Sequence, residues 1–176
     1  MKTVGKMTLG ELAAFVCSHL RKNGIRAVLS GGACVSIYSH SRYQSSDLDF
    51  IANFSASRAK MREVLGEIGF AEHNRYFRHP DTEIFIEFPP GPLTVGEEPV
   101  KEIADMKFST GHLSLISPTD CIKDRLAGYF YWKDLQCLEQ AVLVAQNNPI
   151  DLPELRRWSE NEGKLDEFKK IAKRLA

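Results

Sequence analysis

The feature that most constrains the fold is an apolar segment that runs straight into a glycine pair. Residues 25–30 have the composition of a buried strand, Gly31 and Gly32 interrupt it, and residues 33–38 are apolar again. Because glycine permits tight turns, this order predicts a strand, a sharp turn and a short helix. A chain that alternates strand and helix in this way favours a mixed α and β architecture.

A second strand is expected over residues 47–52, and it carries Asp47 and Asp49. Side chains two positions apart on a strand project from the same face, so these carboxylates lie together, opposite Leu48 and Phe50. Two unscreened carboxylates cannot both ionise cheaply, and Mg²⁺ removes this repulsion because it takes carboxylate oxygens as ligands. The alternative is a solvent-facing strand with two surface acids, but the apolar flanks of this strand favour the metal interpretation.

A third acid stands in another apolar strand, over residues 83–88. Glu87 lies between Ile86 and Phe88. A glutamate in such a strand is costly unless it is paired or binds a metal. Taken alone it also fits a surface-facing position, and Glu83, two positions earlier on the same face, is the alternative third ligand.

The remaining elements before residue 117 follow from caps, turns and periodicity. Thr8 and Glu11 form a capping-box pattern at the start of a helix that Gly24 ends. Further elements are expected in this order: a helix from Ser55 or Ser57 to Ile68, a hairpin of 76–79 with 83–88, and a hairpin of 106–110 with 113–116.

At Ser117 the pattern changes to helices only. Ser117 and Pro118 form a strong helix start, and three or four helices are expected from there to Ala176. With 176 residues the chain fits one domain, or one domain with a helical appendage. We therefore expect an α+β core over residues 1–116 and a helical C-terminal subdomain over 117–176, and the two can share one hydrophobic core.

Composition excludes several classes of protein. The 23 basic and 23 acidic residues cancel, which argues against a protein that coats nucleic acid but not against one that binds a small nucleotide. No apolar run approaches the roughly 18 residues that a membrane span needs, and no signal-peptide pattern opens the sequence. The four cysteines are widely spaced, which indicates buried free thiols rather than a zinc site. A cytoplasmic location is expected.

These motifs together resemble the nucleotidyltransferase fold, the superfamily of DNA polymerase β, aminoglycoside nucleotidyltransferases and minimal nucleotidyltransferases. Its pattern is an apolar residue with a glycine pair, an Asp-x-Asp strand, and a distal acid between apolar residues. Leu29 with Gly31 and Gly32 fills the first slot, and Asp47 with Asp49 fills the second. Glu87 fills the third. The resemblance implies a nucleotidyltransferase-like mixed sheet flanked by helices, with the C-terminal helical subdomain.

The helix over 120–127, followed by Lys133 and Asp134, is similar to a Lys-Leu-x-Ala helix and a later Arg-Asp in nucleotidyltransferase-like toxins of toxin–antitoxin pairs. Arg125 stands where those proteins have lysine. Because lysine and arginine are not equivalent at a phosphate site, this second match is weaker than the first.

The resemblance implies a Mg²⁺-dependent enzyme that transfers a nucleoside monophosphate from an NTP to the hydroxyl of a protein, a tRNA or a small molecule. Two Mg²⁺ ions would be held by the catalytic carboxylates Asp47, Asp49 and Glu87. The residues expected to contact the nucleotide lie at the glycine turn or carry a positive charge: Ser30, Gly31, Gly32, Arg42, Lys123 and Arg125.

Two other interpretations stay open. The first is a catalytically inactive protein of the same fold that binds a nucleotide or a protein partner, for example in a toxin–antitoxin pair, or that forms a homodimer. The second is a plain interaction module whose acids are surface residues. Neither requires a membrane.

Overall fold

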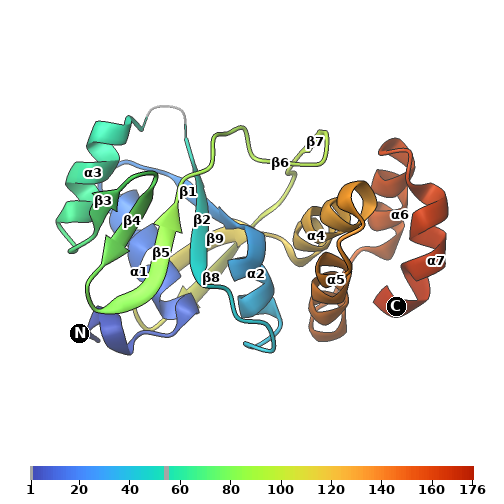
Figure 1. The fold of residues 1–176 in the computed structure, drawn as a ribbon, viewed down its shortest axis with the longest axis horizontal. Helices are drawn as coiled ribbons and strands as arrows, with labels where there is room; N and C mark the ends of the chain where they lie inside the picture. The colour runs from blue at the N-terminus through green and yellow to red at the C-terminus, as the bar shows by residue number, and fades with distance from the viewer. Residues whose placement is uncertain (1, 54–55) are drawn as a thin grey trace.

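The computed structural model describes residues 2–53 and 56–176, and it is an α+β fold (Figure 1). Helices and strands alternate as far as α3, only strands follow up to residue 116, and helices make up the rest. The first half contains a 3₁₀ turn (Val4–Lys6), α1 (Leu9–Lys22), β1 (Ala27–Ser30), α2 (Gly31–Tyr38), β2 (Asp47–Ala52), α3 (Arg58–Gly66), β3 (Ala71–His73), β4 (Tyr76–His79) and β5 (Thr82–Glu87). The second half contains β6 (Thr94–Val95), β7 (Glu98–Pro99), β8 (Ile103–Phe108), β9 (Gly111–Ile116), α4 (Pro118–Trp132), α5 (Leu135–Asn147), α6 (Leu152–Asn161) and α7 (Leu165–Leu175).

The main sheet is mixed, with the strand order β3-β4-β5-β2-β1-β9-β8. β2 runs antiparallel to β1 and parallel to β5, and β1 runs parallel to β9. β6 and β7 form a separate small hairpin. The acid-bearing strand β2 is therefore an inner strand, held between the strand that precedes the glycine pair and the strand that carries Glu87.

Local signals explain where several elements begin and end. The Thr8 hydroxyl accepts a hydrogen bond from the Glu11 amide, and the Glu11 carboxylate accepts one from the Thr8 amide, which confirms the capping box. Gly24 has φ +78° just after α1, a conformation that glycine adopts without strain. The Ser117 hydroxyl caps α4 by accepting from the Asp120 amide, with Pro118 at the first helical position.

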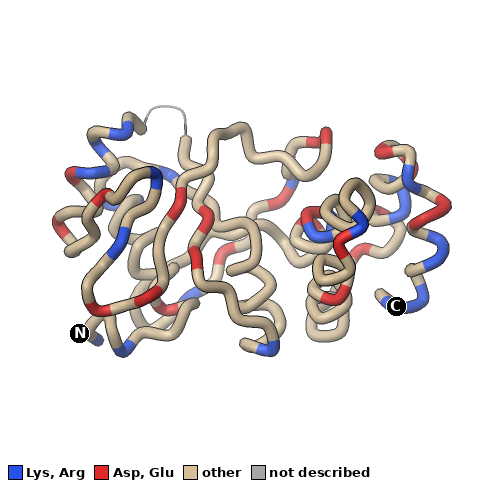
Figure 2. The backbone as a smooth tube through the Cα atoms, in the orientation of Figure 1, with Lys and Arg blue, Asp and Glu red and all other residues tan. Residues whose placement is uncertain are grey.

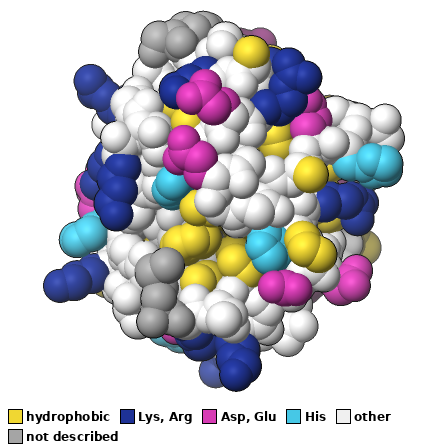
Figure 3. Space-filling view, turned by 90° about the vertical axis from the view of Figure 1, so that its left-hand side faces the viewer, with side chains coloured by type: hydrophobic (Ala, Val, Ile, Leu, Met, Phe, Trp, Pro, Cys, Tyr) yellow, Lys and Arg dark blue, Asp and Glu magenta, His cyan; other side chains and the backbone are white. Residues whose placement is uncertain are grey.

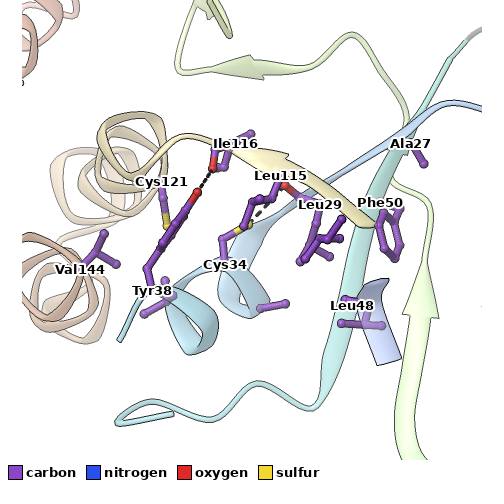
Figure 4. Packing of buried hydrophobic residues seen from close by; sticks show 14 of the residues in the cluster. Ala27, Leu29, Cys34, Tyr38, Leu48, Phe50, Leu115, Ile116, Cys121 and Val144 are labelled. Atoms are coloured by element: carbon purple, nitrogen blue, oxygen red, sulfur yellow. Dashed lines mark hydrogen bonds between the residues drawn. The ribbon is translucent and has the colours of Figure 1, made fainter. Parts of the chain in front are cut away.

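The hydrophobic core is continuous from the sheet to the C-terminal helices. One cluster of buried side chains includes residues of α1, of the inner strands, of α2 and of each helix from α4 to α7. Figure 4 shows the junction, where Tyr38 of α2 packs against α4 and its hydroxyl donates to the Ile116 carbonyl at 2.7 Å. Asn148, after α5, donates to the Tyr38 carbonyl at 2.9 Å. The helices thus fix α2, which follows the glycine pair.

Some boundaries differ from the sequence-based expectation. β1 begins at Ala27 rather than at residue 25, α2 begins at Gly31 rather than at residue 33, and β8 begins at Ile103 rather than at residue 106. Ser57 caps α3 by accepting from the Lys60 amide, whereas Ser55 lies outside the described residues.

The short strands β3, β6 and β7 were not expected, because two or three residues give no periodicity to read. β3 lies at the end of the molecule that Figure 3 shows, where charged side chains surround a smaller area of hydrophobic ones.

Across the part of the chain that the structure describes, no helix is long and apolar enough to cross a membrane.

Candidate active site

The site is built on one face of β2. Asp47 and Asp49 point to this face and are half-buried, whereas Leu48 and Phe50 point to the other face and are completely buried. Burial of the apolar pair fixes the register of the strand, because a slip of one residue would turn every side chain to the wrong face. The core therefore forces both carboxylates onto the same side, as the sequence predicts.

β5 brings the third carboxylate beside them. In the parallel pairing of the two strands, Glu87 stands opposite Asp49 and Phe85 stands opposite Asp47. Figure 2 shows the acidic positions of β2 and β5 side by side. Glu83 is exposed at the far end of β5, so the pairing favours Glu87 over Glu83 as the third acid.

The three carboxylates act on one another electrostatically. Burial, followed by the nearby charges of Asp47 and Glu87, raises the pKa of Asp49 to about 7 in total. A carboxylate that is costly to ionise because of neighbouring carboxylates is stabilised when a cation binds among them. The donor set therefore fits a hard divalent cation such as Mg²⁺.

Two of these acids have partners in the protein. Asp47 accepts a hydrogen bond from the Ser45 hydroxyl at 2.6 Å, and Glu87 forms an ion pair with Arg75 at 3.2 Å. Within residues 2–53 and 56–176, no three His, Cys, Asp or Glu side chains converge closely enough to hold a metal ion as they stand. Metal binding by all three acids therefore requires their side chains to shift, and Glu87 to loosen from Arg75.

The glycine pair meets the same carboxylates. Gly31 has φ +69°, and a Cβ atom there would lie 2.6 Å from an Asp49 carboxylate oxygen. Gly32 has ordinary backbone geometry, and its Cβ would meet the Ser45 hydroxyl at 3.0 Å. Gly31 is thus required both by the backbone conformation and by the approach of Asp49. Ser30, just before it, donates its hydroxyl to the Asp49 carbonyl at 3.3 Å.

A cavity of about 260 Å³ opens beside Asp49; we call it the carboxylate cavity. Ser30 and Gly31 line it, together with a proline-rich segment after β5. Asp124 and Arg125 of α4 enter from the helical side. The carboxylate cavity thus contains part of the glycine turn, one β2 acid and one of the predicted phosphate-binding cations.

Arg125 is held in place by two side chains. Its guanidinium forms a close ion pair with Asp124 and donates to the Gln140 amide oxygen at 3.2 Å. Burial lowers the pKa of Arg125, but Asp124 more than offsets this, so Arg125 remains charged. The sequence did not single out Asp124 or Gln140, because both lie in ordinary helical segments and only tertiary packing brings them to the site.

The structure does not bring Lys123 and Arg42 to the carboxylate cavity. Lys123 is 2% exposed, and its ammonium lies 3.0 Å from Asp120 and 2.8 Å from Glu154, facing a separate cavity. Lys123 thus faces away from the carboxylate cavity, and we interpret it as structural. Arg42 is exposed in the loop after α2 and does not line the cavity.

A second cavity of about 920 Å³ adjoins the first and shares Asp124 and Arg125 with it. Tyr131 and Trp132 line it with exposed aromatic rings, 46% and 77% accessible. These two rings at the end of α4 are therefore not part of the core. Glu162 accepts hydrogen bonds from the Tyr131 hydroxyl and the Glu97 amide at the rim.

Comparison with known proteins supports the fold. No protein-family model matches the chain, and no curated protein matches it in sequence. An antigenic nucleotidyltransferase-like protein from Paracoccidioides brasiliensis has a similar structure, with a TM-score of 0.70 and 13% identity over 95% of this chain and 91% of that one. The antibiotic-resistance factor ANT(2'')-Ia is also similar, with a TM-score of 0.53 and 10% identity over 92% and 91%. The chain therefore has a nucleotidyltransferase fold.

Proposed function

We propose that the protein is a Mg²⁺-dependent nucleotidyltransferase, which moves a nucleoside monophosphate from an NTP to the hydroxyl of an acceptor. The observation that carries this proposal is the pairing of β2 with β5, which puts Glu87 opposite Asp49 on the face that also holds Asp47. The similarity in fold to nucleotidyltransferase-like proteins agrees with it but does not extend to activity at 13% identity.

The metal would be held by Asp47, Asp49 and Glu87. When bound, Mg²⁺ supplies positive charge next to the phosphates and offsets both the burial and the carboxylate repulsion that raise the pKa of Asp49. These half-buried carboxylates are hard oxygen donors. The cysteines Cys17, Cys34 and Cys121 are buried away from the solvent, so a thiolate-preferring metal is not favoured.

The NTP would bind in the carboxylate cavity. The phosphates would approach Gly31, where no side chain intervenes, and Arg125 would neutralise part of their charge. A cavity of about 260 Å³ is small for a whole nucleotide, so the nucleoside would extend into the adjoining larger cavity past Arg125. There Tyr131 or Trp132 would stack on the base.

The transfer then follows in one step. The acceptor oxygen attacks the α-phosphorus, the bond from that phosphorus to the bridging oxygen breaks, and pyrophosphate leaves. The acceptor loses its hydroxyl proton to the Glu87 carboxylate, because β5 lies on the opposite side of β2 from β1 and the glycine turn. Proteins, tRNA and small molecules all carry such hydroxyl groups.

A non-catalytic nucleotide-binding protein of the same fold is the second candidate. The observation that favours it is the state of the carboxylates, because Arg75 already pairs with Glu87 and Ser45 with Asp47. A protein that kept these contacts would bind an NTP without turning it over.

Release of pyrophosphate separates the two candidates. Purified protein is incubated with Mg²⁺ and each of the four ribonucleoside triphosphates, with water as the acceptor. We expect slow Mg²⁺-dependent pyrophosphate release that Asp47→Asn abolishes and that Asp166→Asn, a change of an exposed acid on α7, leaves intact. Nucleotide binding without release would favour the non-catalytic candidate. Release that persists in Asp47→Asn would refute the assigned site.

A further inference from the structure

The carboxylates belong to a longer row that crosses five strands. Strand register places Ser30, Asp49, Glu87, Tyr76 and His73 opposite one another in succession, on β1, β2, β5, β4 and β3. The carboxylate cavity lies at the Ser30 end of this row. The Tyr76 end therefore lies on the side of Glu87 away from the carboxylate cavity. The proposed function requires the acceptor to bind on that side.

That end carries two aromatic rings and two arginines. Tyr76 and Phe85 are half-buried, with ring centroids 4.7 Å apart and an interplanar angle of 67°. The Arg75 guanidinium lies 4.9 Å from the Tyr76 ring, and the Arg78 guanidinium lies 5.3 Å from the Phe85 ring. We call Arg75, Tyr76, Arg78 and Phe85 the β4–β5 platform.

The platform is open to solvent. In Figure 1 no helix covers the face of β4 and β5 that is turned to the viewer, and α1 and α3 lie toward the opposite side. Arg78 is exposed, and the side chain of Arg75 is 71% exposed although it pairs with Glu87. The rings and charges are thus displayed outward beside an acid, rather than used to close the core.

We propose that the β4–β5 platform binds the acceptor, and that the acceptor presents a flat base and a phosphate group, as a nucleotide does. The role of this ligand as the acceptor rests on the proposed function, whereas its binding to the platform does not. Aromatic rings on an open sheet stack with bases, and nearby guanidinium groups attract phosphate. The ligand is a short nucleotide unit, because the chain has no net positive charge to follow a long polyanion.

The position fits the chemistry of transfer. A base stacked on Tyr76 would lie next to Glu87 in the row, so a hydroxyl of the attached sugar would lie close to the acid assigned to take its proton. Arg75 would turn from Glu87 to the acceptor phosphate when Mg²⁺ binds at Glu87, which would couple acceptor binding to the presence of the metal.

Direct binding tests the proposal without turnover. The probes are AMP and a fluorescein-labelled single-stranded RNA hexanucleotide, titrated into the full chain by calorimetry and by fluorescence anisotropy. The test variants are Tyr76→Leu, which removes the ring but keeps apolar volume, and the double change Arg75→Gln with Arg78→Gln. The matched control is Arg156→Gln, an exposed arginine on α6 at the opposite end of the molecule. Melting curves identify any variant that does not fold.

We expect the wild type to bind at least one probe and Tyr76→Leu to bind it roughly fivefold to 150-fold more weakly, the usual loss when one base loses its stacking partner. The arginine variant should also bind more weakly, and Arg156→Gln should bind as the wild type does. Preference for AMP would mean a free nucleotide, and preference for the RNA would mean a strand end; either supports the platform.

Three results would overturn the proposal. The first is that the wild type binds neither probe, and the second is that both Tyr76→Leu and the arginine variant bind as tightly as the wild type. The third is that Arg156→Gln loses as much affinity as the test variants do. If Tyr76→Leu fails to fold, the arginine variant alone decides. Because these titrations need no NTP, platform binding without pyrophosphate release would refute the proposed enzyme and leave the binding surface standing.

Discussion

Asp49 is the residue at which strand register, burial and charge meet. It stands next to Glu87, touches Gly31 and has a pKa raised to about 7 against an ordinary value of 3.8. The folded protein therefore binds a proton at Asp49 between about pH 4 and pH 7, where the unfolded chain has released it. Protonation stabilises the fold, and this contribution is lost as the pH rises toward 7.

Asp49→Asn should remove this pH dependence. We expect the free energy of unfolding of the metal-free wild type to fall from pH 4 to pH 7 relative to the variant, and the variant to be the more stable of the two at pH 8. Urea unfolding with a chelator, measured across this range, checks it. If the free energy of unfolding changed with pH in the same way for both proteins, ionisation of Asp49 would not destabilise the fold.

Substitutions at the glycine pair should have unequal effects. Gly31→Ala puts a side chain in the left-handed region, which costs roughly 1–2 kcal/mol, and also pushes against Asp49. Gly32→Ala keeps an ordinary backbone conformation and meets the Ser45 hydroxyl at 3.0 Å and the Tyr43 ring at 3.4 Å. Urea unfolding should show the larger loss at Gly31, together with weaker NTP binding. Equal stability of the Gly31→Ala protein and the wild type would contradict the structure of this turn.

At the scale of the element, sequence reasoning succeeded where the signal is local. The Thr8 and Ser117 caps, the β2 alternation and the β5 acid could all be read from neighbouring residues. It could not foresee the β6–β7 hairpin, because that hairpin is held by α6 rather than by its own sequence. Trp158 donates to the Val95 carbonyl at 3.2 Å, and Arg157 pairs with Glu98 at 2.6 Å.

The same limit explains why Lys123 was predicted to contact phosphate. Its sequence position, two residues before Arg125, fits a phosphate contact equally well, and only the packing of α6 on α4 turns it toward Glu154. Asp124 was missed for the opposite reason, since nothing in its neighbours marks a helical acid that faces a distant sheet. The sequence of one helix or strand does not show which residue of another element its side chains contact.

Lys123→Met and Arg125→Met should therefore separate stability from binding. Lys123→Met leaves Asp120 without its buried cationic partner, which costs about 3–5 kcal/mol of unfolding free energy by the usual cost of breaking a buried pair, whereas Glu154 keeps its ion pair with Arg157. NTP affinity of the folded Lys123→Met protein should stay within about twofold, whereas Arg125→Met should lower it at least tenfold, near the 1.5–3 kcal/mol typical of a hydrogen bond to a charged group. Calorimetric titration with urea unfolding checks both. A tenfold loss of affinity in Lys123→Met would restore it as a phosphate contact.

At the scale of the whole molecule, the sheet and the C-terminal helices share one core. α2 lies between them, and Tyr38 contacts both the end of β9 and the segment after α5. The cavity that holds Arg125 exists only because α4 packs at the end of the sheet. The proposed boundary near residue 117 is thus a change of secondary structure within a common core.

A fragment of residues 1–117 should therefore fail to fold cooperatively, because loss of the helices exposes the buried side chains of α2. Urea unfolding followed by circular dichroism should give a single transition for the full chain and a broad or absent one for the fragment. A fragment with its own sharp transition would show that residues 1–116 form an independent domain.

The most direct test of the proposed nucleotidyltransferase site is calorimetric titration with a non-hydrolysable NTP, with and without Mg²⁺. We predict that the wild type binds the analogue only with Mg²⁺, and that Asp47→Asn and Asp49→Asn each weaken binding at least tenfold. The matched Asp166→Asn variant, changed at an exposed acid of α7, should bind as the wild type does. Binding that is absent, or that neither depends on Mg²⁺ nor responds to the two β2 substitutions, would contradict the assignment of these carboxylates to a metal–nucleotide site.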